Sequence, residues 1–149
     1  MKKITIIALF LVSVALTRAQ ILQPVKWSYG SKMISKTEAM VFIKATIDQG
    51  WHTYSQSVPD GGPIKTTFTF PASDKYELVG QTSEPKPISK FEKVFNMNVA
   101  FFEHSVVFQQ KIKLKGPGPV EIKGSLEFMT CNDQKCLPPS DIDFTITVK

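Results

Sequence analysis

Residues 39–48 read AMVFIKATID, and an apolar side chain stands at every second position of this stretch. One face of a strand built from it would carry only apolar residues, namely Ala39, Val41, Ile43, Ala45 and Ile47. Residues 120–129 and 142–149 have the same period of two. This period is typical of a β-strand that buries one face and exposes the other. The three stretches therefore predict half-buried strands of an antiparallel sheet.

Five shorter stretches also have strand-like composition, and they are residues 25–31, 51–57, 65–70, 76–81 and 106–114. Gly, Pro, Asp and Ser clusters between them predict turns. About eight strands with turns roughly every 8–13 residues predict an all-β, immunoglobulin-like antiparallel sandwich, and a closed barrel fits the same periodicity. Residues 84–98 (EPKPISKFEKVFNMN) fit no strand well, so they predict a loop long enough to cover a neighbouring site.

The first 19 residues have the three-part pattern of an export signal. Two lysines precede a 13-residue apolar run at residues 4–16, and small residues, Thr17 and Ala19, stand at the −3 and −1 positions of a cleavage site after Ala19. The run is shorter than the ~20 residues that a membrane-spanning helix needs, although an uncleaved anchor is the alternative. We expect a signal peptide over residues 1–19 and a single exported domain over residues 20–149.

Composition and charge exclude several classes of protein. With 42% hydrophobic residues and 11 Phe the chain can build a core, so it is not a disordered polymer. Two cysteines are too few for a disulfide-dense miniprotein. The net charge of +5 includes three basic residues of the export signal, which leaves +2 on the rest. This small excess argues against nucleic-acid binding.

Both cysteines stand in residues 130–139, which read TCNDQKCLPP. Two nearby cysteines in an exported protein are most simply a disulfide, and the Asn-Asp pair between them favours a tight hairpin. Closing a loop of about six residues stabilises a fold by only roughly 2 kcal/mol. If the strand at residues 120–128 continues without a bulge, Cys131 and Cys136 share its outer face, open to exchange. Spacing alone leaves open both a structural staple and a redox-active pair.

Residues 129–139 (MTCNDQKCLPP) resemble the active-site stretch of the N-terminal periplasmic domain of the thiol:disulfide interchange protein DsbD. Residues 50–54 resemble that family's Gly-aromatic-x-x-Tyr strand, and residues 61–70 and 91–108 follow in the expected order. The resemblance covers nearly all of residues 20–149. It implies an immunoglobulin-like sandwich whose disulfide is shielded by a cap loop bearing a Phe.

The resemblance also implies roles for individual residues. Residues 93–98 match the cap, with Phe95 as the shielding ring. Cys136 would form the mixed disulfide with a partner, and Cys131 would resolve it. Five further residues would support the pair, and they are Tyr54, Glu92, Lys135, Pro138 and Pro139. Lys135 could stabilise a thiolate, and the two prolines would hold the following chain extended.

Some positions depart from the family's pattern. Lys93 and Val94 stand where acids often flank the cap Phe, so Glu92 is the nearest acid. Leu137 stands where an aromatic residue often follows the second cysteine. Proton handling near the thiols would therefore differ from that of other members.

The leading functional hypothesis is a periplasmic thiol–disulfide exchange module that acts as a monomer. Its partners would be thioredoxin-like or other exported redox proteins, with a membrane protein as a further electron donor, and no organic cofactor or metal is implied. The competing hypothesis is a non-catalytic β-sandwich that binds a partner and keeps the bridge as a staple.

The other chemistry-bearing residues predict packing or surface positions. His52 and His104 match no zinc-site spacing when they are combined with the cysteines. Trp27, Trp51 and Tyr54 fit a sandwich core better than a ligand platform.

Overall fold

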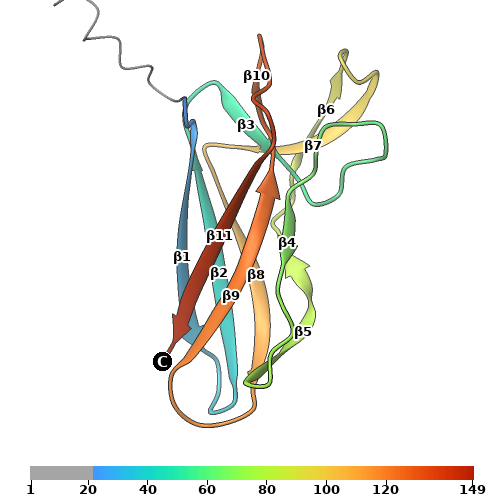
Figure 1. Cartoon of the computed structure of the whole chain (residues 1–149). Coiled ribbons are helices and arrows are strands. Elements are labelled where there is room, and N and C mark those ends of the chain that lie inside the picture. The colour runs from blue at the N-terminus through green and yellow to red at the C-terminus, as the bar shows by residue number, and fades with distance from the viewer. Residues whose placement is uncertain (1–21) are drawn as a thin grey trace, which may run out of the picture.

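Eleven β-strands and no helix make up residues 22–149, the part of the chain that the computed structural model describes. In chain order they are β1 (Val25–Met33), β2 (Glu38–Ile47), β3 (Trp51–Tyr54), β4 (Thr67–Thr69), β5 (Tyr76–Ser83), β6 (Ile88–Glu92), β7 (Met97–Glu103), β8 (Ser105–Leu114), β9 (Val120–Phe128), β10 (Thr130–Asn132) and β11 (Ser140–Val148) (Figure 1). The described residues thus contain no helix that could cross a membrane. The signal peptide expected over residues 1–19 lies outside them.

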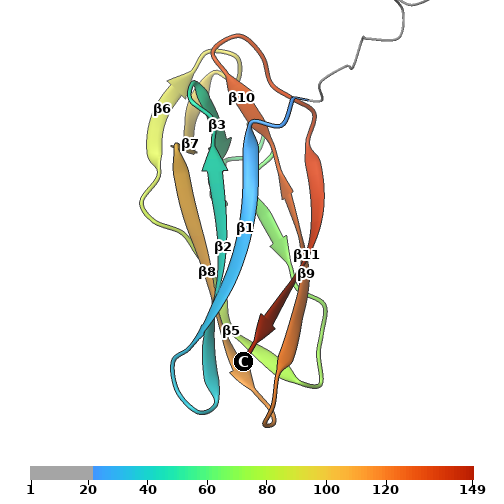
Figure 2. The same ribbon diagram turned by 90° about the vertical axis from the view of Figure 1, so that its left-hand side faces the viewer.

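The strands form three sheets, and every pairing is antiparallel. Two body sheets, ordered β1-β2-β8-β5 and β11-β9-β4, form two layers of a sandwich. The third, which we call the end sheet, has the order β10-β3-β7-β6 and lies at one end of the molecule (Figure 2). The predicted immunoglobulin-like sandwich is confirmed, and its separate sheets rule out the closed barrel.

The main core fills the space between the body sheets and comes from the alternating stretches. Val41, Ile43 and Ala45 of β2 are fully buried, as the period of two predicted. Trp27 and Trp51 pack against this core, in line with the packing role expected of them. A smaller group, which we call the end cluster, is buried in the end sheet and consists of Tyr54, Val99, Phe101 and Cys131.

Two strands of the body sheets, β8 and β9, are each joined to a strand of the end sheet by a short break in the chain's β-structure. β7 passes into β8 at His104, which adopts a left-handed conformation with φ 63°. β9 ends at Phe128, and β10 starts two residues later on the far side of Met129. These breaks turn the chain so that β7 and β10 both pair with β3 and carry the end cluster.

The segment at residues 84–98 is not the loop that its sequence predicts. It contains β6, which pairs with β7 across a turn at residues 93–96. Most side chains of β6 are exposed, so it has no apolar alternation. In β7 the adjacent residues Phe101 and Phe102 are both buried, the first in the end cluster and the second in the main core. Neither strand therefore shows the period of two by which a half-buried strand is recognised.

Candidate functional site

The two cysteines close a tight hairpin at the tip of the end sheet. Their sulfur atoms are bonded at 2.02 Å, and the residues face each other as an antiparallel bridge. The backbone N–H of Asn132 donates to the Lys135 carbonyl at 2.9 Å. The Asn132 side-chain oxygen accepts from the N–H groups of Gln134 at 2.9 Å and Lys135 at 2.8 Å. The turn-forming role expected of Asn132 thus has a direct structural basis.

The two cysteines differ in their exposure to solvent. Cys131 is only 2% exposed, whereas Cys136 is exposed. The prediction that Cys131 lies on an outer face is therefore wrong. It assumed that the outer face stays open to solvent, but β10 pairs with β3, and the end cluster covers the face that carries Met129 and Cys131. Of the two residues, Cys136 is therefore the one more open to solvent.

The β6–β7 turn places one aromatic ring beside the cysteines. Backbone hydrogen bonds from Phe95 to Glu92 at 3.2 Å and from Asn96 to Lys93 at 3.3 Å hold the turn. Asn96 adopts φ 53°, a left-handed value that asparagine tolerates well. Phe95 is half-buried and packs against the end cluster, which includes Cys131, while its neighbour Val94 is 85% exposed. Of these two turn residues, Phe95 is the one directed at the disulfide region.

His52 lies directly across from Cys131, although its sequence position indicated only packing or surface. It pairs with Cys131 in the β3–β10 register and is 8% exposed. Its Nε2 atom lies 3.2 Å from the Tyr54 hydroxyl, and its ring packs on Phe101 at a centroid distance of 4.8 Å. The pairing of β3 with β10 joins segments almost 80 residues apart. No local pattern could have revealed this neighbour.

Burial governs the protonation of the Tyr54 phenol and of the His52 imidazole. It raises the pKa of Tyr54 to about 12, and the nearby Glu92 carboxylate adds to the rise. Tyr54 therefore stays a neutral phenol at any physiological pH. Burial also lowers the pKa of His52, against the opposing effect of Glu92, Glu103 and Asp133.

The remaining residues expected at the site lie around the hairpin. Glu92 ends β6 and is half-buried. Lys135, Pro138 and Pro139 are exposed on the hairpin and on the chain that leaves it. Among residues 22–149 no group of three or more His, Cys, Asp or Glu side chains could hold a metal ion. His104 is exposed at the β7–β8 junction and is not a neighbour of Cys131 in any strand pairing.

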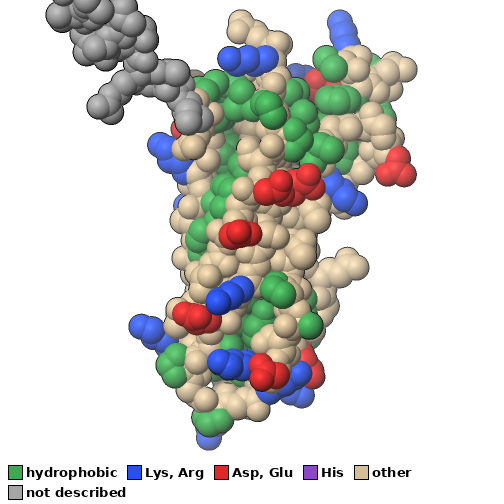
Figure 3. Space-filling model, viewed as in Figure 1, with side chains coloured by type: hydrophobic (Ala, Val, Ile, Leu, Met, Phe, Trp, Pro, Cys, Tyr) green, Lys and Arg blue, Asp and Glu red, His purple; other side chains and the backbone are tan. Residues whose placement is uncertain are grey.

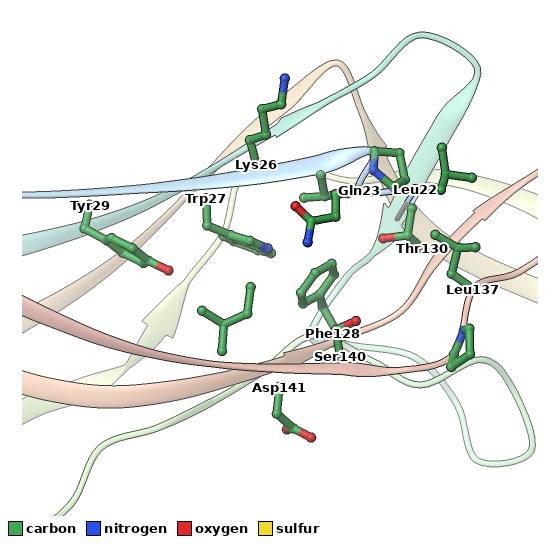
Figure 4. A pocket seen from close by; sticks show the side chains of 14 residues that line it. Leu22, Gln23, Lys26, Trp27, Tyr29, Phe128, Thr130, Leu137, Ser140 and Asp141 are labelled. Carbon is green, nitrogen blue, oxygen red and sulfur yellow. The ribbon is translucent and has the colours of Figure 1, made fainter. Parts of the chain in front are cut away.

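A cavity of about 510 Å³ adjoins the hairpin, lined among others by Trp27, Phe128, Thr130 and Leu137 (Figure 4). The Trp27 Nε1 and Thr130 Oγ1 atoms are buried there, and neither has a hydrogen-bond partner among the described residues. Side chains alternate along a strand, so Thr130 points to the opposite face of β10 from Cys131. The cavity is therefore separate from the disulfide.

The sequence matches a family described as "Thiol:disulfide interchange protein DsbD, N-terminal" over residues 18–147. No curated protein sequence matches the chain. The expected resemblance to this family is thus supported by a match over most of the chain.

Solved structures share the fold at low sequence identity. The reduced N-terminal domain of Neisseria meningitidis DsbD is 19% identical, with a TM-score of 0.51, and the match covers 80% of this chain and 84% of that one. The same domain in complex with the PilB N-terminal domain is 18% identical, with a TM-score of 0.55 and coverages of 85% and 87%. The N-terminal periplasmic domain of Proteus mirabilis ScsB is 18% identical, with a TM-score of 0.56 and coverages of 84% and 48%. This chain therefore matches about half of the ScsB domain.

Proposed function

The chain belongs to the family of DsbD N-terminal domains, and from this premise we propose that its Cys131–Cys136 pair exchanges disulfides with other exported proteins. The observation that carries the proposal is the unequal exposure of the two cysteines next to Phe95. Cys136 is exposed, Cys131 is buried, and Phe95 packs on the cluster that contains Cys131. A purely structural staple needs neither this asymmetry nor an aromatic neighbour on a turn.

Exchange would begin at the exposed sulfur. A partner thiolate attacks Cys136 Sγ in line with the S–S bond, a partner–Cys136 disulfide forms, and Cys131 leaves as a thiolate that takes up a proton. A second partner thiolate then attacks the partner's sulfur in this mixed disulfide and releases Cys136. Two electrons pass from the partner to the pair. In the reverse direction Cys136 attacks a partner disulfide, and Cys131 resolves the mixed disulfide.

Four residues would assist at Cys136, and three of them lie on the hairpin or on the chain that leaves it. The Lys135 ammonium would favour a thiolate on the adjacent residue. Pro138 and Pro139 would keep the chain after the hairpin extended, because proline fixes φ near −65°. Glu92 would act less directly, as the acid closest to the cap in sequence.

The partner would dock on the end of the molecule that carries the hairpin and the cap. Hydrophobic side chains gather on this end, over β3 and β10, in the view of Figure 3. Ile88, Phe91 and Val94 of the β6–β7 hairpin are exposed hydrophobic residues. The Neisseria domain is seen in complex with the PilB N-terminal domain. For this chain we propose a partner with a thioredoxin-like fold.

The module would work in the periplasm, the compartment named for the ScsB domain. Removal of residues 1–19 would then leave a mature protein whose N-terminal sequencing reads from Gln20.

A comparison of two reductants tests the function and the cap together. Reduced thioredoxin should open the oxidised bridge faster than a small thiol at equal thiolate concentration, because a protein partner can displace Phe95. Phe95→Ala should speed reduction by the small thiol on the order of tenfold, since access to the sulfur is one factor that sets the exchange rate. Alkylation of new thiols followed by mass spectrometry measures both rates.

Val94→Ala is the matched control, because Val94 is the exposed neighbour in the same turn. It should leave the rate of reduction by the small thiol unchanged. If Phe95→Ala reduces at the wild-type rate, or if it unfolds the domain, Phe95 is a core residue and the cap proposal fails.

A further inference from the structure

Three side chains lie in one row across the end sheet. Cys131 of β10 pairs with His52 of β3, and His52 pairs on its other side with Glu103 of β7. Residues paired across antiparallel strands point to the same face, with Cβ atoms typically ~4.5–5.5 Å apart. A thiol-forming residue, an imidazole and a carboxylate thus follow each other across three adjacent strands.

The ring of His52 is held in place by contacts on the same face. Tyr54 follows two residues along β3, and its ring meets that of His52 edge-on at a centroid distance of 5.3 Å. The hydrogen bond between His52 Nε2 and the Tyr54 hydroxyl, at 3.2 Å, joins the tips of the two side chains. Since Tyr54 stays neutral, its oxygen can accept from Nε2–H. This leaves Nδ1, the ring nitrogen nearer the backbone, as the nitrogen that Tyr54 does not engage.

We propose that His52 is the proton acceptor and donor for Cys131 during disulfide exchange. The inference deepens the proposed exchange function and rests on it. When a partner thiolate breaks the bridge at Cys136, His52 takes up a proton from solvent and gives its Nδ1 proton to the departing Cys131 thiolate, so the products are a neutral thiol and a neutral imidazole. In the reverse step neutral His52 takes the thiol proton while Cys131 Sγ attacks Cys136 Sγ and the partner thiolate leaves.

The charges around His52 suit a group that changes its protonation state. Glu103 of β7, Glu92 of β6 and Asp133 of the hairpin favour the imidazolium, and Lys90 of β6 opposes it. Burial outweighs these charges, so the pKa of His52 lies below its ordinary value of about 6.5. His52 is therefore neutral at pH 7, ready to accept a proton from the Cys131 thiol.

His52 approaches Cys131 from β3, on the opposite side of Cys131 from its disulfide partner strand. An imidazole on that side can act while the cap is displaced.

A two-phase reaction with the aromatic disulfide dithiobis-nitrobenzoate separates the roles of the cysteines. In the reduced full chain, Cys136 attacks the reagent and releases one coloured nitrothiobenzoate. Cys131 then attacks Cys136 Sγ and releases the second. The first phase reports Cys136, and the second reports the step assigned to His52.

His52→Gln should slow the second phase on the order of a hundredfold and leave the first unchanged, because only the resolving step loses its proton acceptor. The pH profile should change as well. In the wild type the second phase should level off above the pKa of His52, since neutral imidazole then carries the proton. In His52→Gln it should keep rising with pH through this range, because the Cys131 thiol must then ionise without a neighbouring proton acceptor.

His52→Phe keeps the ring packing on Phe101 but cannot accept a proton, so it should match His52→Gln. His104→Asn is the matched control, because His104 is exposed and asparagine tolerates its left-handed backbone. It should leave both phases and both pH profiles unchanged.

An unchanged second phase in folded His52 variants would overturn the role of His52 while leaving disulfide exchange standing. If the variants do not fold, the pH profile of the second phase in the wild type decides. Its second phase must level off at the pKa of His52 measured by NMR titration, and a profile without that inflection overturns the inference. If the wild type shows no second phase, exchange by this pair fails, and the role of His52 fails with it.

Discussion

Cys131→Ser should trap a long-lived mixed disulfide with a thioredoxin-like partner, whereas Cys136→Ser should give little or no adduct. Cys136 is exposed and adjoins Lys135, so its sulfur can meet a partner. Cys131 is buried in the end cluster and has no open approach. In Cys131→Ser the first exchange step can occur, but no second thiol is left to resolve its product.

The measurement uses thioredoxin that keeps only its attacking cysteine, activated as a nitrothiobenzoate disulfide. Each variant is mixed with it, and the adduct is quantified by non-reducing electrophoresis and intact mass. The yield should differ by an order of magnitude or more, and the double serine variant should give none. Equal yields from the two single variants would refute the assignment of roles, and no adduct from either would favour a structural bridge.

Phe108→Ala should cost the domain about 3–5 kcal/mol of unfolding free energy, the usual range for deleting a buried Phe. Phe108 is 0% exposed in the main core. Its ring packs against three other aromatic rings at centroid distances of 4.9–6.1 Å, those of Phe68, Phe102 and Trp27. Strands around it come from both body sheets, so the cavity left behind could not close without moving a sheet.

Urea unfolding of the oxidised protein measures this loss. Phe91→Ala is the matched control, because Phe91 is 51% exposed on β6 and should change stability by less than about 0.5 kcal/mol. If Phe108→Ala and Phe91→Ala cost the same, Phe108 does not organise the core.

The strands of the body sheets could be predicted because the alternation that identifies each strand lies within its own stretch of sequence. Strand β2 was expected from residues 39–47 alone, since alternation with one buried face needs no knowledge of the partner strand. In the end sheet only β3 was expected, from residues 51–57. β6 is mostly exposed, and β7 buries the adjacent residues Phe101 and Phe102, which interrupts its alternation.

The candidate site was predicted in its residue types but not in its geometry. The hairpin between the cysteines follows from Asn132 and the short spacing, and the structure contains it. The burial of Cys131 depends on the end sheet that covers its face, and the alternation of β9 gives no sign of that cover. The place of His52 opposite Cys131 depends on long-range pairing between β3 and β10. Contacts of this kind arise from topology, which a local pattern does not encode.

Whether the bridge is exchanged or permanent is tested most directly by its reduction potential. The intact protein is equilibrated with glutathione buffers of known ratio, and the fraction of reduced pair is read by alkylation and mass spectrometry. Disulfide exchange predicts a potential above about −300 mV, in the range of thioredoxin-type pairs, so that both redox states are populated across the series. A pair that stays oxidised in every buffer, with a potential below about −300 mV, would contradict exchange and identify Cys131–Cys136 as a structural disulfide.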